Sequence, residues 1–543
     1  MNLLPFPSGL FSTSSLSFKQ FYRQKGIFGP SFVLMPVSRF FVRNELLSLN
    51  PKKSTGLDDI SPLFLHDGAD YLAEPIKHIV NLSILSETVP SGLKQAKVIP
   101  LFKKGSKLDP GNYRPVSILS SISKVLERAV NDQLVKYLDS KKLFYEYQSG
   151  FRNRFSTDTC LINLVDYIKG ENKKGNLVGM VLIDLRKAVD TVDEDILLQK
   201  LSAMGVTSID WFRSYLKDRE QCTQVDGINS SFLEVTCGVP QGSILGPTLF
   251  LCYVNDMSSS LQCRLSLYAD DSALIFSGKN ATDIANFLST EISSCQKWLI
   301  DNRLSLHVGK TECIIFGTRK RLKKVGAFTV TCDGETVQRV TSVKYLGVIL
   351  DQYLCFDDYV DSICDKADNK LSFLHRYSSI LDFKTRRLLC ESLISSSLTY
   401  CVSSWYSGVG QRLKTRLEVI QRKMVRYVNG WHPRYHVGLP EITAVGWLFI
   451  PKRVSFFKLC HHYKVKTGQA PQYLAQDFQT TASVHSYSTR GSDLNYVPNC
   501  RDFPNNTFHY TVVREWNELP ANVKSETSLV RFKRALKHHF MND

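Results

Sequence analysis

The sequence LSLYADDSALIF, residues 265–276, places short apolar runs on either side of the acidic pair Asp270–Asp271. Runs of this length, interrupted by turn-forming residues, predict two strands joined by a hairpin turn that carries the aspartates. A third apolar run, residues 181–183, leads directly into another acidic residue, Asp184. A carboxylate at a strand terminus and others in a hairpin turn can converge on one point. The pattern therefore predicts an acidic cluster assembled from distant parts of the chain.

Clustered carboxylates repel one another unless a divalent cation neutralises them, and Mg²⁺ prefers hard oxygen ligands of this kind. Two such ions, about 3.5–4 Å apart, can activate an attacking hydroxyl group and stabilise a leaving pyrophosphate. Between Asp184 and the acidic pair lies the glycine-rich segment GVPQGSILGP, residues 238–247, which leads into the apolar run 248–254. A lone acidic pair is weak evidence, whereas this ordered set indicates metal-dependent nucleotide chemistry.

The remaining patterns indicate a fold of mixed helix and sheet. Residues 124–139 carry apolar side chains at helical spacing and predict a helix. Strands and helices alternate without a strict βαβ order, which favours an α+β fold over a doubly wound sheet. Beyond about Asp351 the pattern is mostly helical.

Composition and charge limit the class of protein. The chain has 543 residues, of which 43% are hydrophobic and 22% charged, so it is globular rather than disordered. It contains no run of about 18 apolar residues, which argues against a transmembrane helix. Its 14 cysteines include no CxxC pair, which argues against zinc ribbons and a disulfide framework. The net charge of +17 favours a polyanionic partner, and residues 361–543 hold 26 Lys and Arg against 14 Asp and Glu.

The first 44 residues contain no Asp or Glu, and they resemble a transit peptide in composition. We prefer to interpret residues 1–45 as a poorly ordered leader, with a mitochondrial address as the alternative. The expected organisation is this leader, then a catalytic region over residues 46–350 with its core motifs at about 84–350. A helical, basic region over residues 351–543 completes it.

The motifs, taken in order, resemble the reverse transcriptases of non-LTR (LINE-type) retrotransposons, closest to the CR1 and jockey groups. The resemblance covers roughly residues 51–351, and more loosely the rest of the chain. It rests on KVIPLFKKG (97–105), NYRPVS (112–117), QSGFR (148–152), Asp184, GVPQGSILGP (238–247), YADD (268–271), the spaced residues Trp298, Asn302, Leu306 and Lys310, and YLG (345–347). It implies a right-hand polymerase with fingers, a palm with an antiparallel sheet, and a helical thumb followed by a mostly helical C-terminal region.

The resemblance also implies roles for particular residues. Two Mg²⁺ ions, or Mn²⁺ in their place, would be held by Asp184, Asp270 and Asp271 with the backbone carbonyl of Leu185. The nucleotide-binding residues would be Lys103 (or its neighbour Lys104), Arg114, Gln241 and Gly242. Lys310 would donate a proton to the leaving pyrophosphate, although a plain surface lysine is an equal alternative. Template or primer contacts would come from Arg152 and from the turn at Leu346–Gly347.

One position departs from the family pattern. The family usually places Phe or Tyr five residues after the first catalytic Asp, where the ring excludes a 2′-hydroxyl group, and this chain has Val189 there. Val leaves space where a ring would clash, so we expect weakened exclusion of ribonucleotides; a decayed copy of the element is the alternative explanation. A second departure, His307 in place of the usual Asn, concerns only the geometry of the motif that contains Lys310.

The C-terminal third contains a basic amphipathic segment, residues 411–428. Its apolar stripe predicts a helix, and Arg412, Arg416 and Lys423 beside the stripe are candidate contacts with a template–primer backbone. The segment RFKRALKHH, residues 531–539, is a second basic helix that could contact nucleic acid. Adjacent residues rarely share one tetrahedral metal site, so we interpret Cys460-His461-His462 as structural.

The function that these residues imply is RNA-directed DNA synthesis: a primer 3′-hydroxyl attacks a dNTP on an RNA template. The expected partners are an RNA template, a DNA primer or target DNA, and dNTPs, in the nucleus or cytoplasm and without a membrane. The residues before Pro51 are too few for an endonuclease domain, so we expect the chain to lack one. A catalytically decayed nucleic-acid-binding relic is the main alternative; a group II intron-like maturase and an RNA-dependent RNA polymerase fit the motifs less well.

Overall fold

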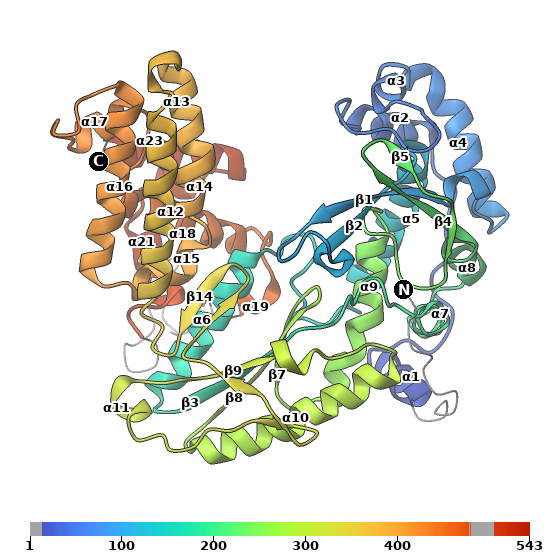
Figure 1. The fold of residues 1–543 in the computed structure, drawn as a ribbon, viewed down its shortest axis with the longest axis horizontal. Helices are drawn as coiled ribbons and strands as arrows, with labels where there is room; N and C mark the ends of the chain where they lie inside the picture. The colour runs from blue at the N-terminus through green and yellow to red at the C-terminus, as the bar shows by residue number, and fades with distance from the viewer. Residues whose placement is uncertain (1–13, 477, 479–503, 543) are drawn as a thin grey trace. The chain divides into compact units, whose positions relative to one another are not determined.

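The computed structural model describes residues 14–476, 478 and 504–542, and its chain divides into two compact units. The first unit comprises residues 1–151, 184–262 and 293–307, and the second comprises 152–183, 263–292 and 308–543. Each unit therefore combines segments that are far apart in the sequence. Figure 1 traces the chain by colour from the N-terminus to the C-terminus.

The first unit is built on a five-stranded mixed sheet in the order β2-β1-β4-β5, with β6 also paired to β4. Strands β1 and β2 are antiparallel, whereas β1 and β4 are parallel. Its strands are β1 (Gln95–Phe102), β2 (Tyr113–Ile118), β4 (Arg219–Val225), β5 (Ile228–Asn229) and β6 (Leu233–Val235). Its helices are α1 (Ser14–Gln24), α2 (Arg39–Ser48), α3 (Pro62–Asp67), α4 (Ala69–Leu85), α5 (Ser121–Ser140), α7 (Glu194–Ala203), α8 (Ile209–Leu216) and α9 (Gly246–Val254).

The second unit contains the five-stranded sheet β12-β9-β3-β8-β7, two small hairpins and most of the helices. Its strands are β3 (Leu177–Ile183), β7 (Arg264–Tyr268), β8 (Asp271–Gly278), β9 (Glu312–Phe316), β10 (Thr331–Cys332), β11 (Glu335–Thr336), β12 (Gln338–Arg339), β13 (Ser342–Tyr345) and β14 (Val348–Asp351). Its helices are α6 (Thr157–Lys173), α11 (Arg319–Leu322), α12 (Asp357–His375), α13 (Phe383–Leu389), α14 (Ser396–Leu398), α15 (Val402–Trp405), α16 (Gln411–Asn429), α17 (Leu439–Ala444), α18 (Ile450–Lys466), α19 (Gln472–Ala475), α21 (Phe508–Glu518), α22 (Ala521–Lys524) and α23 (Leu529–Asn542). Helix α10 (Ala281–Asp301) begins in this unit and ends in the first.

Strand β3 is the buried centre of the second unit's sheet. It pairs antiparallel with β8 on one side and with β9 on the other. Because side chains alternate along a strand, its two faces are covered by different helices. Val178 and Met180 join the apolar core formed with α6. On the opposite face a Cβ atom on Gly179 would lie 2.5 Å from Ile284 and 2.7 Å from Leu288, so α10 packs closely against the strand there.

Several sequence predictions about these elements are confirmed. Helix α5 covers the predicted helix at 124–139, and β3, β7 and β8 cover the three apolar runs that lead to or follow the aspartates. The region beyond Asp351 is helical throughout its described elements. The sheet around β3 is mixed rather than wholly antiparallel, because the short edge strand β12 runs parallel to β9.

The described part of the N-terminal segment contains a helix that packs through aromatic side chains. Residues 14–24 form α1, and Phe18 and Tyr22 are buried. The Tyr22 hydroxyl accepts a hydrogen bond of 2.9 Å from the Asn255 side chain, which also donates to the Leu143 carbonyl. Aromatic side chains thus hold this segment against the first unit, despite its leader-like composition. Residues 1–13 of the expected leader lie outside the described residues.

The apolar core of the second unit contains residues on both sides of position 350, where we expect a domain boundary. One apolar core runs from β3 and α6 through β14 into α12 and α16. Because this core is continuous, the sheet groups with the helices that follow it along the chain. Within the described ranges, no helix is both long enough and apolar enough to cross a membrane.

Candidate active site

The three aspartates predicted to act together lie at or beside the ends of β3, β7 and β8. Ile183, the last residue of β3, pairs with Ser272, and Tyr268 pairs with Asp271 across the β7–β8 hairpin. Asp184 is the next residue after Ile183, so the chain leaves β3 at the end of the ladder where the hairpin turn lies. Ala269 has φ of 56°, a left-handed conformation in that tight turn. Asp184, Asp270 and Asp271 are all exposed.

These donors are chemically suited to a hard divalent cation, because carboxylate and carbonyl oxygens are the ligands that Mg²⁺ prefers. In the part of the chain that the structure describes, no group of three or more His, Cys, Asp or Glu side chains is arranged to hold a metal ion. The fit to Mg²⁺ therefore rests on the donor chemistry and on the strand register.

The segment after Asp184 is anchored by the backbone that follows α10. The Asp184 carbonyl accepts a hydrogen bond of 2.9 Å from the His307 amide. Leu185 forms an isolated antiparallel bridge with Leu306, and the Arg186 amide donates to the Ser305 carbonyl at 3.0 Å. The departure at His307 is therefore compatible with this contact, since a backbone amide makes it.

The glycine-rich segment 238–247 forms a tight loop in the first unit. Gly242 has φ of 128°, and a Cβ atom there would lie 2.4 Å from the Ser117 carbonyl oxygen. The Gln241 carbonyl accepts a hydrogen bond of 2.7 Å from the Ser117 amide. Gly238 has φ of 88°, and its Cβ would lie 2.7 Å from the Asp190 carbonyl oxygen. Both glycines are thus required by close backbone approach as well as by conformation.

A side-chain hydrogen bond joins this loop to the turn that follows Asp184. The Gln241 Nε2 donates to Asp190 Oδ1 at 2.7 Å, and the Val239 amide donates to the Val189 carbonyl at 3.1 Å. Burial raises the pKa of the half-buried Asp190, an effect that the hydrogen bond from Gln241 opposes. The sequence motifs assigned no role to Asp190, although it directly follows Val189, the residue that departs from the family pattern.

A buried carboxylate on α5 holds the other end of the same loop. Glu127 is fully buried, and its Oε2 accepts a hydrogen bond of 2.6 Å from the Ile244 amide. Its Oε1 accepts one of 3.0 Å from the Tyr215 hydroxyl. Burial raises the pKa of Glu127, and these hydrogen bonds oppose that rise. The sequence carried a signal for this residue, because Glu127 falls at helical spacing from the apolar Val130 and Leu134 and so lies on the buried face.

The candidate triphosphate-binding cations lie on the β1–β2 hairpin. Leu101 pairs with Arg114, and the Lys103 amide donates to the Asn112 carbonyl at 2.8 Å, so the ladder continues to Lys103. Since side chains two residues apart share one face of a strand, Lys103 lies on the face of Arg114. Lys104 lies beyond the ladder, in the bend that follows β1. The register therefore distinguishes two lysines that the sequence could not separate.

The motif expected to contain Lys310 has a buried part, which includes Trp298, and an exposed part, which includes Lys310. The Trp298 Nε1 donates to Asp256 Oδ2 at 3.1 Å, and Lys200 Nζ donates to Asp256 Oδ1 at 2.6 Å. This buried trio was not singled out from the sequence. Desolvation lowers the pKa of Lys200, although Asp256 favours its charged form. Lys310 is exposed at the end of a short 3₁₀ helix, Val308–Lys310.

The predicted turn at Leu346–Gly347 is the hairpin turn between β13 and β14. Leu346 has φ of 47° and Gly347 has φ of 86°. The Tyr400 hydroxyl donates to the Leu346 carbonyl at 2.9 Å, so the turn is held by the helical part of the second unit. Arg152 lies near the start of α6, with its guanidinium 4.2 Å from the centroid of the Phe155 ring.

The basic helix predicted at 411–428 is α16, and its predicted apolar stripe is buried. It packs against α12, whose acidic residues meet its cations. Arg416 is paired with Asp361 and Asp365. The exposed Arg412 lies 3.8 Å from Asp361, and Lys423 lies 2.6 Å from Asp368. All three candidate cations thus have carboxylate partners.

The segment Cys460-His461-His462 lies within α18. His461 Nε2 is 2.8 Å from Asp158 Oδ2, a contact between α18 and α6. His462 is fully buried, with its ring centroid 4.8 Å from that of Trp516. Burial lowers the pKa of His462 to about 3, with Lys466 and His509 adding to the effect. The two histidines therefore contact different parts of the second unit.

Comparison with known proteins assigns the segment that carries these motifs to a family. Residues 102–350 match the family described as "Reverse transcriptase (RNA-dependent DNA polymerase)". This part of the chain is therefore a reverse transcriptase domain, and reverse transcriptases are enzymes.

The relatives narrow the class further. The chain is 27% identical to the RNA-directed DNA polymerase from mobile element jockey of Drosophila funebris, over 74% of this chain and 45% of the relative. It is 26% identical to the probable RNA-directed DNA polymerase from transposon BS of Drosophila melanogaster, with the same coverages. For the X-element protein of that species, identity is 25% over 65% of this chain and 39% of the relative. The resemblance to non-LTR retrotransposon reverse transcriptases is confirmed, and the chain spans less than half the length of each of these relatives.

The buried His462 predicts a pH-dependent stability. An unfolded histidine titrates near 6.5, whereas burial lowers the pKa of His462 to about 3. Between these values the unfolded chain binds a proton that the folded chain excludes, so the free energy of unfolding falls as the pH drops below about 6.5. We expect the melting temperature to fall less steeply from pH 6.5 to pH 4 in His462→Phe than in the unmodified chain, as followed by circular dichroism. Equal slopes in the two proteins would contradict this assignment.

Proposed function

We propose that the chain is an RNA-directed DNA polymerase that joins a dNTP to a primer 3′-hydroxyl on an RNA template. The register of β3 with β8 supports this proposal most directly, because it brings the end of β3 to the hairpin turn that carries two further carboxylates. The reverse transcriptase match over residues 102–350 and the names of the relatives support it independently.

In this proposal Asp184, Asp270 and Asp271, with the Leu185 carbonyl, would hold two Mg²⁺ or Mn²⁺ ions. When bound, such ions supply Lewis-acid stabilisation of the charge that develops on the reacting oxygens. Lys310 would donate a proton to the pyrophosphate as it leaves.

The nucleotide would be held by residues of the first unit. Lys103 and Arg114 share one face of the β1–β2 hairpin and would bind the triphosphate, Arg through a planar fork and Lys as a mobile charge. Gln241 would contact the nucleotide, and Gly242 would let the backbone approach it closely. Val189 would lie beside the sugar.

Template and primer would contact residues of the second unit. Leu346 and Gly347 form a turn suited to holding a primer end, and Arg152 is a candidate contact with the template. Arg412, Arg416 and Lys423 remain proposed contacts, but a phosphate would have to compete with the carboxylates of α12 for them.

The polymerase subdomains follow from these roles. We assign the β1–β2 region to the fingers, the sheet around β3 to the palm, and helices α12 to α18 to the thumb. A catalytically decayed relic is the second candidate, and Val189 is the observation that favours it, because decay relaxes selection at such a position.

The first test is primer extension on poly(rA)/oligo(dT) with Mg²⁺. We expect Asp270→Ala and Asp271→Ala each to reduce the rate at least ~100-fold, because carboxylates that hold catalytic ions account for several kcal/mol of transition-state stabilisation. Asp283→Ala, a change on the first turn of α10, is the matched control and should retain activity. An unmodified chain with no extension above the aspartate variants would favour the relic.

The second test concerns sugar selectivity. We expect Val189→Phe to raise the ratio of dNTP to rNTP incorporation by ~10-fold or more, because an aromatic ring would clash with a 2′-hydroxyl group. Val189→Ile, which adds a single methylene, should change the ratio little. Strong exclusion of rNTPs by the unmodified chain, measured by kcat/KM for each nucleotide, would rule out the role given to Val189.

The third test concerns Asp190 as a positioning residue that acts through Gln241. Asp190→Ala removes the acceptor of the 2.7 Å hydrogen bond, so we expect the KM for dNTP to rise ~10-fold with a smaller change in kcat. Asp190→Asn keeps an acceptor oxygen and should restore most of the affinity. Equal loss in both variants, or a loss confined to kcat, would contradict this role.

A further inference from the structure

The last helix of the chain presents a basic face of a different kind from that of α16. Residues 527–542 include four Lys and Arg and two His, and no Asp or Glu. Within α23, Phe532 and Leu536 are fully buried. The Phe532 ring stacks on Tyr463 of α18 with centroids 4.4 Å apart and lies 5.8 Å from Trp516 of α21. The apolar face thus fixes the helix, and its polar face remains outside this core.

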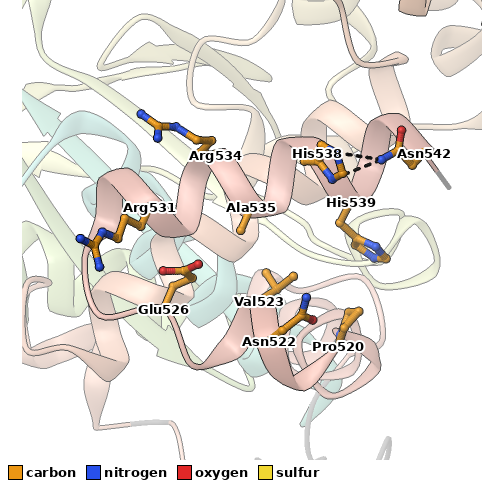
Figure 2. Close-up of a pocket in the computed structure, with 10 residues that line it drawn as sticks. All are labelled: Pro520, Asn522, Val523, Glu526, Arg531, Arg534, Ala535, His538, His539 and Asn542. Atoms are coloured by element: carbon orange, nitrogen blue, oxygen red, sulfur yellow. Dashed lines mark hydrogen bonds between the residues drawn. The ribbon is translucent and has the colours of Figure 1, made fainter.

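The polar face of α23 lines an open hollow of about 730 Å³ together with α22 (Figure 2). Arg531, Arg534 and His538 come from one stripe of the helix, with the spacing of three and four residues that places side chains on a common face. Asn522 on α22 lines the opposite side, and Asn542 lies within 3.2 Å of the His538 ring.

The cations of α23 differ from those of α16 in whether carboxylates lie beside them. The cations of α16 lie against the carboxylates of α12. In the described ranges, by contrast, Arg531, Lys533, Arg534 and Lys537 form no ion pair with a carboxylate, and Glu526 is the single acidic residue that lines the hollow. Cations without carboxylate partners retain their full attraction for phosphate, whereas paired cations must first give up a partner.

We propose that the hollow between α22 and α23 is a nucleic-acid site that takes the sugar–phosphate backbone of a strand. Arg531 and Arg534 would bind phosphate oxygens through their planar forks. Asn522, His538 and Asn542 would supply further hydrogen bonds to phosphate or sugar. This inference rests on the proposed function only for the kind of partner, since a polymerase of this class must hold a nucleic-acid strand. The residues proposed to bind the strand have no part in nucleotide addition.

The test uses the full chain without dNTP and a fluorescein-labelled 20-nucleotide single strand, with anisotropy read from 50 to 300 mM salt. We expect the double variant Arg531→Gln/Arg534→Gln to raise the Kd ~10-fold or more at 100 mM salt. The slope of log K against log salt should become shallower by about 1.4, the value for two lost phosphate contacts on a single strand.

The matched control is Lys77→Gln/Arg213→Gln, which removes the same number of cations from α4 and α8, where they are paired with Glu74 and Asp210. Because those cations are paired, the control should change the Kd less than ~3-fold. Equal losses for RNA and DNA strands of one sequence would assign the site to phosphates alone, whereas a larger loss for RNA would add a contact with the 2′-hydroxyl group.

The proposal is overturned if the α23 variant binds within ~2-fold of the unmodified chain with an unchanged salt slope, or if the Lys77→Gln/Arg213→Gln control loses as much affinity. Melting temperatures of all variants confirm that the helices remain folded. Primer extension is a separate readout. If the chain binds the strand through Arg531 and Arg534 but extends no primer, the polymerase is refuted and the α23 site is supported. If the chain extends a primer but the α23 variant binds as the unmodified chain does, the α23 site is refuted and the polymerase is supported.

Discussion

The antiparallel register between β3 and β8 is the constraint on which the candidate active site depends. Ile183 pairs with Ser272, and Tyr268 pairs with Asp271, so the end of β3 and the hairpin turn lie at one end of the sheet. A slip of one residue would turn every side chain of β3 to the opposite face. That slip is prevented because the two faces differ: Val178 and Met180 pack in the core with α6, and only a glycine at 179 leaves room for Ile284 and Leu288.

Two carboxylates that carry no catalytic role in the proposal hold the glycine-rich loop, residues 238–247. Glu127 accepts a hydrogen bond from the Ile244 amide, and Asp190 accepts one from the Gln241 side chain. Burial raises the pKa of both carboxyl groups. Each carboxylate is partly removed from water and in return is held in place as a hydrogen-bond acceptor for the loop. Leaving a buried donor without its acceptor costs about 1–3 kcal/mol, so replacing either carboxylate should destabilise this loop.

The two basic helices show why net charge alone does not locate a nucleic-acid contact. Both α16 and α23 are rich in cations and both bury an apolar stripe. They differ in what faces the cations: α12 presents Asp361, Asp365 and Asp368 to α16, whereas among the described residues no carboxylate forms an ion pair with the cations of α23. The electrostatic attraction for phosphate follows this compensation rather than the number of Lys and Arg in a helix.

The sequence by itself determined the family, the helix at 124–139, the strands around the aspartates and the residue types at the candidate site, because these follow from local periodicity and ordered motifs. It also identified Val189 as a departure. Only the tertiary structure decided that residues 14–24 pack through Phe18 and Tyr22, that the β1–β2 ladder continues to Lys103 on the face of Arg114, and that the cations of α16 are paired. Each of these depends on which distant element lies opposite a side chain, and a local pattern carries no information about that partner.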